Sequence, residues 1–156
     1  MTNLKPGDKA PNFETTDEQG NPVALADFKG KKIVLYFYAS DDSGTCRVEA
    51  CNLRDNFEVL RKASYHVLGV SPDSKKHHLS FVKKHSLPFP LLMDEDMKII
   101  QAYGVWGPKE LFGRQYDGLL RTTFLINGEG IIERVIYPVE SKRHTEQILE
   151  GEKVSG

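Results

Sequence analysis

The sequence lacks the features of a membrane-spanning or secreted protein. No apolar run approaches the ~20 residues that a transmembrane helix needs. The first residues, MTNLKPGD, have neither the basic start nor the apolar core of a signal peptide. Two cysteines are too few for the disulfide framework of a small secreted domain. We therefore expect a cytoplasmic protein with no membrane partner.

A strong excess of charge of one sign is also missing. The chain carries 21 Lys and Arg against 22 Asp and Glu, a formal net charge of -1, which argues against a nucleic-acid partner. No low-complexity tract, internal repeat or Gly/Ser linker divides the 156 residues, and this length suits one hydrophobic core. The sequence predicts a single domain, 1–156, with residues 150–156 as a frayed tail.

The pattern of apolar residues predicts alternating strands and helices. Residues 33–38, IVLYFY, are typical of a strand that is buried on both faces. Further strands are expected at 66–71, 89–93, 121–126 and 131–137, helices at 47–62, 74–85, 96–103 and 142–149, and a hairpin at 11–27. This order predicts an α/β protein with a thioredoxin-like fold, in which helices flank a mixed central sheet and a β-hairpin extends the N-terminus.

Both cysteines lie in the stretch SDDSGTCRVEAC, residues 40–51, where the first buried strand meets the next helix. Open α/β folds place their sites at such junctions. Cys46 falls in the first helical turn, where free backbone N–H groups and the helix dipole favour an anion. Because the thiolate is the nucleophile of thiol chemistry, we expect Cys46 to attack and Cys51 to remain an ordinary thiol.

The spacing of the cysteines sets a geometric limit. In an ideal helix, residues five apart have Cα atoms roughly 8.6 Å apart and point ~140° away from each other. A disulfide needs a Cα separation below about 7 Å. A cycle that joins Cys46 to Cys51 must therefore unwind a turn, which Gly44 at the helix start and Val48, a mediocre helix former, would favour.

Other uses of the cysteines stay open at this stage. Both side chains could serve only in core packing, because cysteine is among the most buried residue types. A metal site and a general disulfide oxidoreductase have less support, since the chain contains neither C-x-x-C nor H-x₃₋₅-H. We expect the histidines on the surface or at the edge of the core: His66, His77, His78, His85 and His144.

Four stretches of the sequence resemble the peroxiredoxins of the alkyl hydroperoxide reductase/thiol-specific antioxidant family, in particular the bacterioferritin-comigratory-protein or Q-type subfamily. They are GDKAPNFETTDEQG, VLYFYASDDSGTCRVEACNLRD, VLGVSPDSKKHHLSFVKKHSLPFPLLMDED with AYGVW after it, and RTTFLINGEGII. The resemblance implies a thiol peroxidase that reduces hydrogen peroxide and organic hydroperoxides without a metal, haem or flavin cofactor.

The resemblance also implies how the two cysteines work. Cys46 matches the peroxidatic cysteine, which becomes a sulfenic acid, and Cys51 matches the resolving cysteine, which joins it in an intramolecular disulfide. Thioredoxin or a glutaredoxin-like dithiol protein would reduce this disulfide. Relatives of this type imply a monomer or weak dimer.

Three further residues match named positions of the subfamily. Ser43 matches the hydroxyl of the motif P-x-x-x-[TS]-x-x-C and would hold the peroxide together with the backbone amides of Thr45 and Cys46. Arg121 matches the arginine that stabilises the thiolate and polarises the leaving oxygen. Glu49 matches a common glutamate, which either orients Arg121 or is a solvated helix charge.

The match has two departures from the family motif. Ala39 stands where the motif has proline, and Gly44 and Thr45 replace the usual Pro-Gly before the cysteine. Proline restricts the backbone, so these replacements predict a more mobile site loop.

A non-enzymatic interpretation is also open. The chain could be a redox-sensing or chaperone-like binding module that the disulfide switches. Three apolar residues are expected either in a patch beside the site or in the core: Trp106, Leu111 and Phe112.

Overall fold

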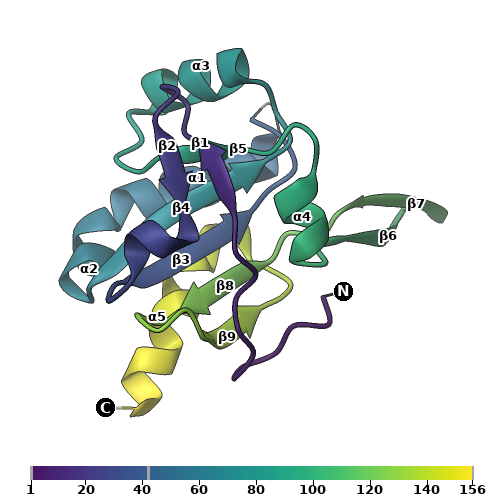
Figure 1. The fold of residues 1–156 in the computed structure, drawn as a ribbon. Helices are drawn as coiled ribbons and strands as arrows, with labels where there is room; N and C mark the ends of the chain where they lie inside the picture. The colour runs from purple at the N-terminus through teal and green to yellow at the C-terminus, as the bar shows by residue number, and fades with distance from the viewer. Residues whose placement is uncertain (1, 42, 156) are drawn as a thin grey trace.

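A five-stranded mixed sheet forms the centre of the computed structural model, which describes residues 2–41 and 43–155 (Figure 1). The strands lie in the order β5-β4-β3-β8-β9. Their bounds are β3 (Lys32–Phe37), β4 (Tyr65–Ser71), β5 (Leu91–Met93), β8 (Thr123–Ile126) and β9 (Ile132–Ile136). β3 pairs in parallel with β4 and antiparallel with β8, which confirms the predicted mixed sheet.

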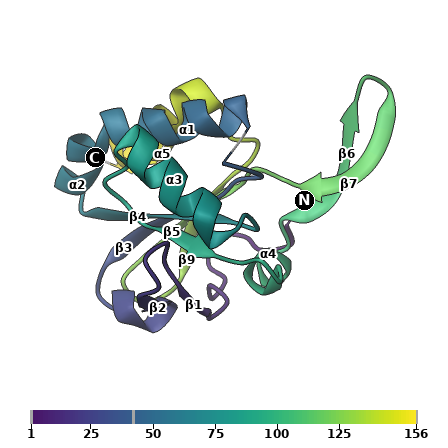
Figure 2. The same cartoon turned by 90° about the horizontal axis from the view of Figure 1, so that it is seen from above.

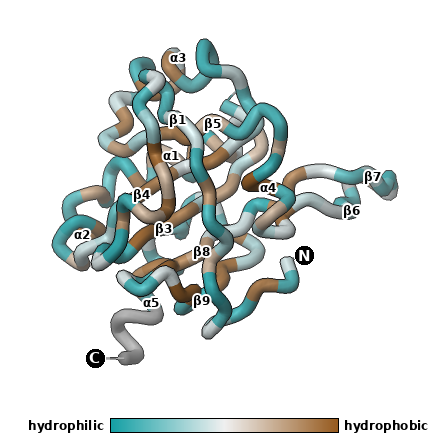
Figure 3. The backbone as a smooth tube through the Cα atoms, viewed as in Figure 1, coloured by the Kyte–Doolittle hydropathy of each residue, from teal (hydrophilic) through white to brown (hydrophobic). Residues whose placement is uncertain are grey.

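The central strand β3 is buried on both faces, as its composition predicts. Side chains of a strand alternate between the two faces of its sheet. One face receives Ile33, Leu35 and Phe37, and the other receives Val34, Tyr36 and Tyr38. The chain therefore builds two cores on one sheet, and Figure 3 shows the hydrophobic residues gathered along β3, β4 and β8.

Four helices cover one face of the sheet, and the N-terminal hairpin with two short helices covers the other (Figure 2). The first layer contains α1 (Gly44–Asp55), α2 (Phe57–Lys62), α3 (Lys75–His85) and α5 (His144–Ser155). The second contains β1 (Glu14–Thr16), β2 (Pro22–Ala24), the 3-10 helix η1 (Leu25–Phe28) and α4 (Lys98–Ala102). β1 pairs antiparallel with β2, so the predicted hairpin is confirmed.

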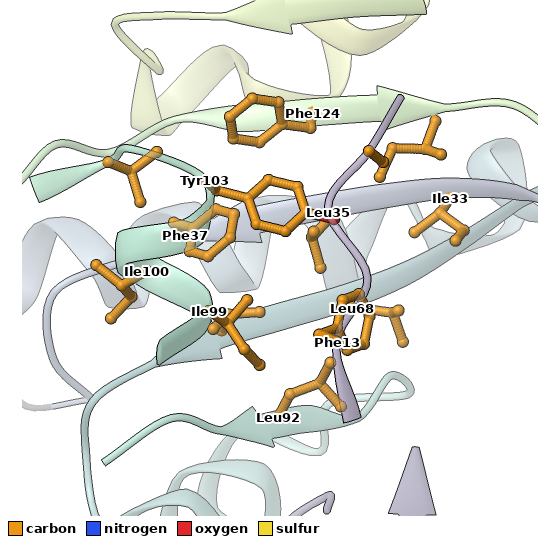
Figure 4. Packing of buried hydrophobic residues seen from close by; sticks show 14 of the residues in the cluster. Phe13, Ile33, Leu35, Phe37, Leu68, Leu92, Ile99, Ile100, Tyr103 and Phe124 are labelled. Atoms are coloured by element: carbon orange, nitrogen blue, oxygen red, sulfur yellow. The ribbon is translucent and has the colours of Figure 1, made fainter. Parts of the chain in front are cut away.

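Aromatic rings fill the core on the α4 side (Figure 4). The Tyr103 ring lies 5.3 Å from Phe37 and 5.1 Å from Phe124, between centroids. Its hydroxyl donates to the backbone oxygen of Pro11 at 2.7 Å. This side chain thus ties the N-terminal segment to the core across the sheet from the cysteines.

The predicted helix 47–62 is two helices. It begins earlier, at Gly44, and it breaks at Asn56, where α1 ends before α2 begins. The Asn56 side chain donates to the backbone oxygen of Asn52 at 2.8 Å. Asparagine commonly competes with the helix in this way, by bonding its own backbone neighbours.

The last helix is longer than predicted. A 3-10 turn, η2 (Ser141–Arg143), leads into α5, which continues to Ser155 where the sequence predicted a helix end near Leu149 and a frayed tail. Arg143 bonds the carboxylates of Glu146 and Glu150, a pattern that supports helical turns. The side chains of 151–155 and all of residue 156 lie outside the described residues.

No strand or helix is predicted for residues 104–120, and here the structure has a hairpin of β6 (Trp106–Leu111) and β7 (Arg114–Leu119). It projects from the body of the protein in both views (Figures 1 and 2). Phe112 and Gly113 both adopt a positive φ at its turn, as two-residue hairpin turns require. The strand expected from Arg121 begins only at Thr123.

Trp106 and Phe112 do not form one patch. Trp106 begins β6 and is 42 % exposed, whereas Phe112 follows the strand and is 96 % exposed. Six residues of strand separate them by about 20 Å. The side chain of Leu111 lies outside the described residues. Over the part of the chain that is described, no helix has the length and apolar character that crossing a membrane requires.

Candidate active site

The loop after β3 delivers Cys46 to the start of α1. Ser43 is the N-cap of the helix, and its hydroxyl oxygen accepts the backbone N–H of Cys46 at 3.4 Å. The Ser43 carbonyl accepts the N–H of Arg47 at 2.9 Å. Cys46 is therefore the third residue of α1, in the first turn as predicted, and Thr45 precedes it with an exposed side chain.

The two cysteines lie in different surroundings on the same helix. Cys46 is 1 % exposed and packs in the core between α1 and the sheet. Cys51 is half-buried, and both are free thiols. Because α1 is continuous from Gly44 to Asp55, this is the wound form, in which helix geometry keeps the two residues too far apart to bond.

Glu49 lies one turn beyond Cys46 and is buried, with no exposed side-chain surface. Its Oε2 is 3.8 Å from Nη1 of Arg121, whose side chain is 28 % exposed. Burial raises the pKa of Glu49 to about 8, and the Arg121 charge opposes this only in part. The expectation of a solvated helix charge is thus wrong, and the structure brings together Glu49 and Arg121 from distant parts of the chain.

The Glu49–Arg121 pair retains unused hydrogen-bonding capacity. Within the described part of the chain, both carboxyl oxygens of Glu49 and Nη1 of Arg121 are buried without a hydrogen-bond partner. Buried polar atoms are normally paired, and an exception asks for an explanation. An arginine with a free donor beside the first turns of α1 can bind an oxygen that develops negative charge.

Two further buried polar side chains lie on the same face of the sheet. Nε2 of His144 is 2.7 Å from Oγ1 of Thr123, and its ring meets Tyr36 edge-on, at 5.5 Å between centroids. Burial, and then the charge of Arg121, lower the pKa of His144 to about 3. His144 is therefore neutral and internal, and its prediction as a surface or core-edge residue is wrong.

A second buried histidine fixes the loop before α1. Asp41 accepts the hydroxyl of Tyr38 at 2.7 Å through Oδ1, and its Oδ2 lies 2.7 Å from Nδ1 of His78. His78 has no exposed surface, so its prediction as a surface or core-edge residue is also wrong. Asp73 adds a bond from the Asp41 N–H at 2.7 Å. Asp73, just after β4, and His78 of α3 thus hold the loop that lacks the family prolines.

Sequence reasoning missed these loop anchors, although one signal pointed to His78. It lies three residues before Phe81 on α3, on the same helical face, and that face packs inward. His77, the adjacent histidine, is exposed. Among the residues that the structure describes, no three His, Cys, Asp or Glu side chains are grouped as metal ligands would be.

Comparison with known proteins places this arrangement in a family. The AhpC/TSA family matches residues 6–135. Peroxiredoxin Bcp of Escherichia coli K12 is 42 % identical over 149 residues, which cover 96 % of this chain and 96 % of that protein. These matches do not favour the interpretation as a non-enzymatic binding module.

Solved structures show the same relationship. A cysteine-to-serine mutant of PrxQ from Xylella fastidiosa superposes with a TM-score of 0.90 at 28 % identity over 99 % of both chains. A Xanthomonas campestris bacterioferritin comigratory protein, described for its alkyl peroxide reduction activity, superposes with a TM-score of 0.84 at 29 % identity, covering 92 % of this chain and 91 % of that one. The chain therefore belongs to the AhpC/TSA family, and within it to the Bcp or Q-type peroxiredoxins, which are thiol-dependent peroxidases.

Proposed function

We propose that the chain reduces hydrogen peroxide and organic hydroperoxides with Cys46 as the peroxidatic residue and Cys51 as the resolving residue. The observation that carries the proposal is the placement of Cys46 in the first turn of α1, at the sheet edge, with Cys51 in the same helix. Helix N-terminal amides favour the thiolate, which is the reactive form of cysteine.

In the first step, the Cys46 thiolate attacks one peroxide oxygen. The O–O bond breaks, the sulfur is oxidised to sulfenic acid, and the other oxygen leaves as water or an alcohol after it takes up a proton. The Ser43 hydroxyl and the first-turn amides of Thr45 and Cys46 bind the peroxide. The bond from the Cys46 amide to Ser43 Oγ is long, at 3.4 Å, so a peroxide oxygen can replace it.

Arg121 stabilises the negative charge on the leaving oxygen, and Glu49 orients the Arg121 side chain. Support comes from the unpartnered Nη1 of Arg121 and its 3.8 Å approach to the Glu49 carboxyl. Because Glu49 is buried and its pKa is raised to about 8, its carboxyl is mostly protonated near pH 7. The arginine charge is then only weakly neutralised and remains available to the substrate.

In the second step, α1 unwinds from its first turn and Cys51 attacks the sulfenic sulfur, giving an intramolecular disulfide and water. A protein reductant cannot reach Cys46 while it is 1 % exposed, but the unwound segment presents the disulfide at the surface. Thioredoxin or a glutaredoxin-like dithiol protein then reduces it by thiol–disulfide exchange. No metal or other cofactor takes part in these steps.

The proposal includes the setting of the reaction. The chain acts as one domain, 1–156, in the cytoplasm, as a monomer or weak dimer. A single peroxidatic site and its resolving cysteine in one helix need no residue from a second copy.

One equivalent of peroxide followed by mass spectrometry tests the cysteine roles. We expect a Cys46–Cys51 disulfide in the wild type and a trapped sulfenic acid at Cys46 in Cys51→Ser. Coupled turnover with thioredoxin and its reductase should be lost in Cys46→Ser. Wild-type turnover in Cys46→Ser would contradict the proposal, and so would a disulfide between two chains in place of the internal one.

A further inference from the structure

The end of α3 contacts the second cysteine. His85 is the last residue of α3, and its Nδ1 lies 3.9 Å from Sγ of Cys51. This distance is that of a weak sulfur hydrogen bond, with the thiol as donor when the ring carries its proton on Nε2. The His85 ring also packs edge-on against Phe81, at 4.9 Å between centroids, which fixes its orientation toward α1.

A second contact keeps His85 and Cys51 together. Nη1 of Arg54 donates to the backbone oxygen of His85 at 2.8 Å. Arg54 lies three residues after Cys51 and therefore close to it on the helix surface. The second half of α1 is thus attached to the end of α3, so the contact at Cys51 survives when the first turn of α1 opens around Cys46.

Burial and nearby positive charges disfavour the protonated form of His85. Burial contributes most, and the nearby cations Lys84, Arg54 and Arg47 add to it, so the pKa of His85 lies below its usual 6.5. Two other titratable groups, Asp41 and His77, line the same cavity of about 230 Å³. Asp41 is already bound by Tyr38 and His78.

We propose that His85 is a further catalytic residue, the base that accepts the thiol proton of Cys51 and so sets the rate of disulfide formation. This rests on the proposed role of Cys51 as the resolving residue. The S–H bond of Cys51 breaks, its proton passes to Nδ1, and its sulfur forms the S–S bond as the S–O bond of the Cys46 sulfenic acid breaks. The departing hydroxide takes up the proton from His85 and leaves as water. Cys51 sulfur is oxidised, and Cys46 sulfur is reduced.

The expected size of the effect follows from thiol chemistry. A free cysteine with an ordinary pKa near 8.5 is only about 3 % thiolate at pH 7. Removing the base should therefore slow disulfide formation about tenfold and at most about thirtyfold at this pH. In the wild type the rate should change little from pH 6.5 to 8.5, whereas without the base it should rise with pH over this range, because the thiol must then lose its proton to solvent.

The test separates the two steps by rapid mixing with peroxide, acid quench and mass spectrometry. His85→Asn keeps a polar atom near the position of Nδ1 and removes the base. The matched control is His66→Asn, an exposed histidine on β4 whose ring lies 6.0 Å from that of Phe28, on the other face of the sheet. We expect unchanged sulfenic acid formation in both variants, and slow, pH-dependent disulfide formation in His85→Asn alone. The same rate and pH profile in His85→Asn as in the wild type would overturn the proposal.

A second variant distinguishes loss of the base from structural damage at position 85. His85→Ala leaves a gap beside Cys51, and added imidazole should restore disulfide formation in proportion to its neutral fraction. Failure of imidazole to restore the rate, with sulfenic acid formation intact, would also count against the base. A wild type that forms no Cys46–Cys51 disulfide would instead defeat the proposed function itself, so the two failures are distinguishable.

Discussion

Replacing Gly44 with proline should slow the opening of α1. Gly44 is the first residue of the helix, the position where helices accept proline best because the N–H there has no helical partner. Ser43 before it has φ -74° and ψ 129°, the extended conformation that proline requires of its predecessor. Among the described residues, a Cβ at Gly44 would meet only Nη2 of Arg47, at 3.8 Å, so there is room for the Cβ of a proline.

The magnitude follows from backbone entropy. Proline at a compatible position stabilises the ordered state by ~0.4–1 kcal/mol, and the glycine that it replaces is the residue with the most freedom to lose. We take about 1 kcal/mol in favour of the wound helix. Since about 1.4 kcal/mol is a factor of ten, the unwound population, and with it the rate of disulfide formation, should fall about fivefold.

Rapid quench after peroxide addition measures this rate, with the rate of sulfenic acid formation as the internal reference. Gly44→Ala, which adds a Cβ but keeps the N–H, should give a smaller slowing than Gly44→Pro. The longer-lived sulfenic acid should also be oxidised further, to sulfinic acid, at lower peroxide. Disulfide formation as fast in Gly44→Pro as in the wild type would refute the requirement for unwinding at the first turn.

Three further predictions concern stability in urea. The pKa of Glu49 is raised from 4.5 to about 8, so the free energy of unfolding of the wild type should fall by about 1.4 kcal/mol per pH unit between these values. The stability of Glu49→Gln relative to the wild type should therefore increase as pH rises from 5 to 8. The pKa of His144 is lowered from 6.5 to about 3, so the wild type should lose stability at a similar slope as pH falls below 6.5, and His144→Gln should lose less. For either variant, a stability curve parallel to that of the wild type across pH would contradict the prediction. Gly128→Ala places a Cβ 2.9 Å from the backbone of Gly30 and should cost ~1–3 kcal/mol, whereas an unchanged urea midpoint would show that the two loops separate freely.

The sequence predicted well those strands and helices whose position depends on the burial of apolar side chains alone. The run 33–38 lies at the centre of the sheet because each of its side chains is apolar enough for one of the two cores. The hairpin of β6 and β7 was missed for the opposite reason. Its strands are mostly exposed and therefore carry no apolar alternation, and Phe112 occupies a left-handed turn position where Asn or Gly gives the usual signal.

In the site, the features set by local sequence were predicted, and those set by contacts between distant parts of the chain were not. The position of Cys46 is local, since a serine cap and the helix start define it within four residues, and the sequence predicted it. The burial of Glu49 is not local, because Arg121 reaches it from the chain before β8. The same holds for His85, whose contact with Cys51 joins the end of one helix to the middle of another.

The two halves of α1 are held very differently, and this decides where the helix opens. Among the described residues, the side-chain bond of the first turn is a long one, from the Cys46 N–H to Oγ of Ser43 at 3.4 Å. The second half is docked on α5 and its lead-in: Asn52 accepts the N–H of Thr145 at 2.9 Å and its hydroxyl at 2.7 Å, and donates to the carbonyl of Lys142 at 3.0 Å. In the proposed cycle, opening therefore begins at the N-terminal end and stops before Asn52, so that Cys46 is the mobile partner of the disulfide and Cys51 the fixed one.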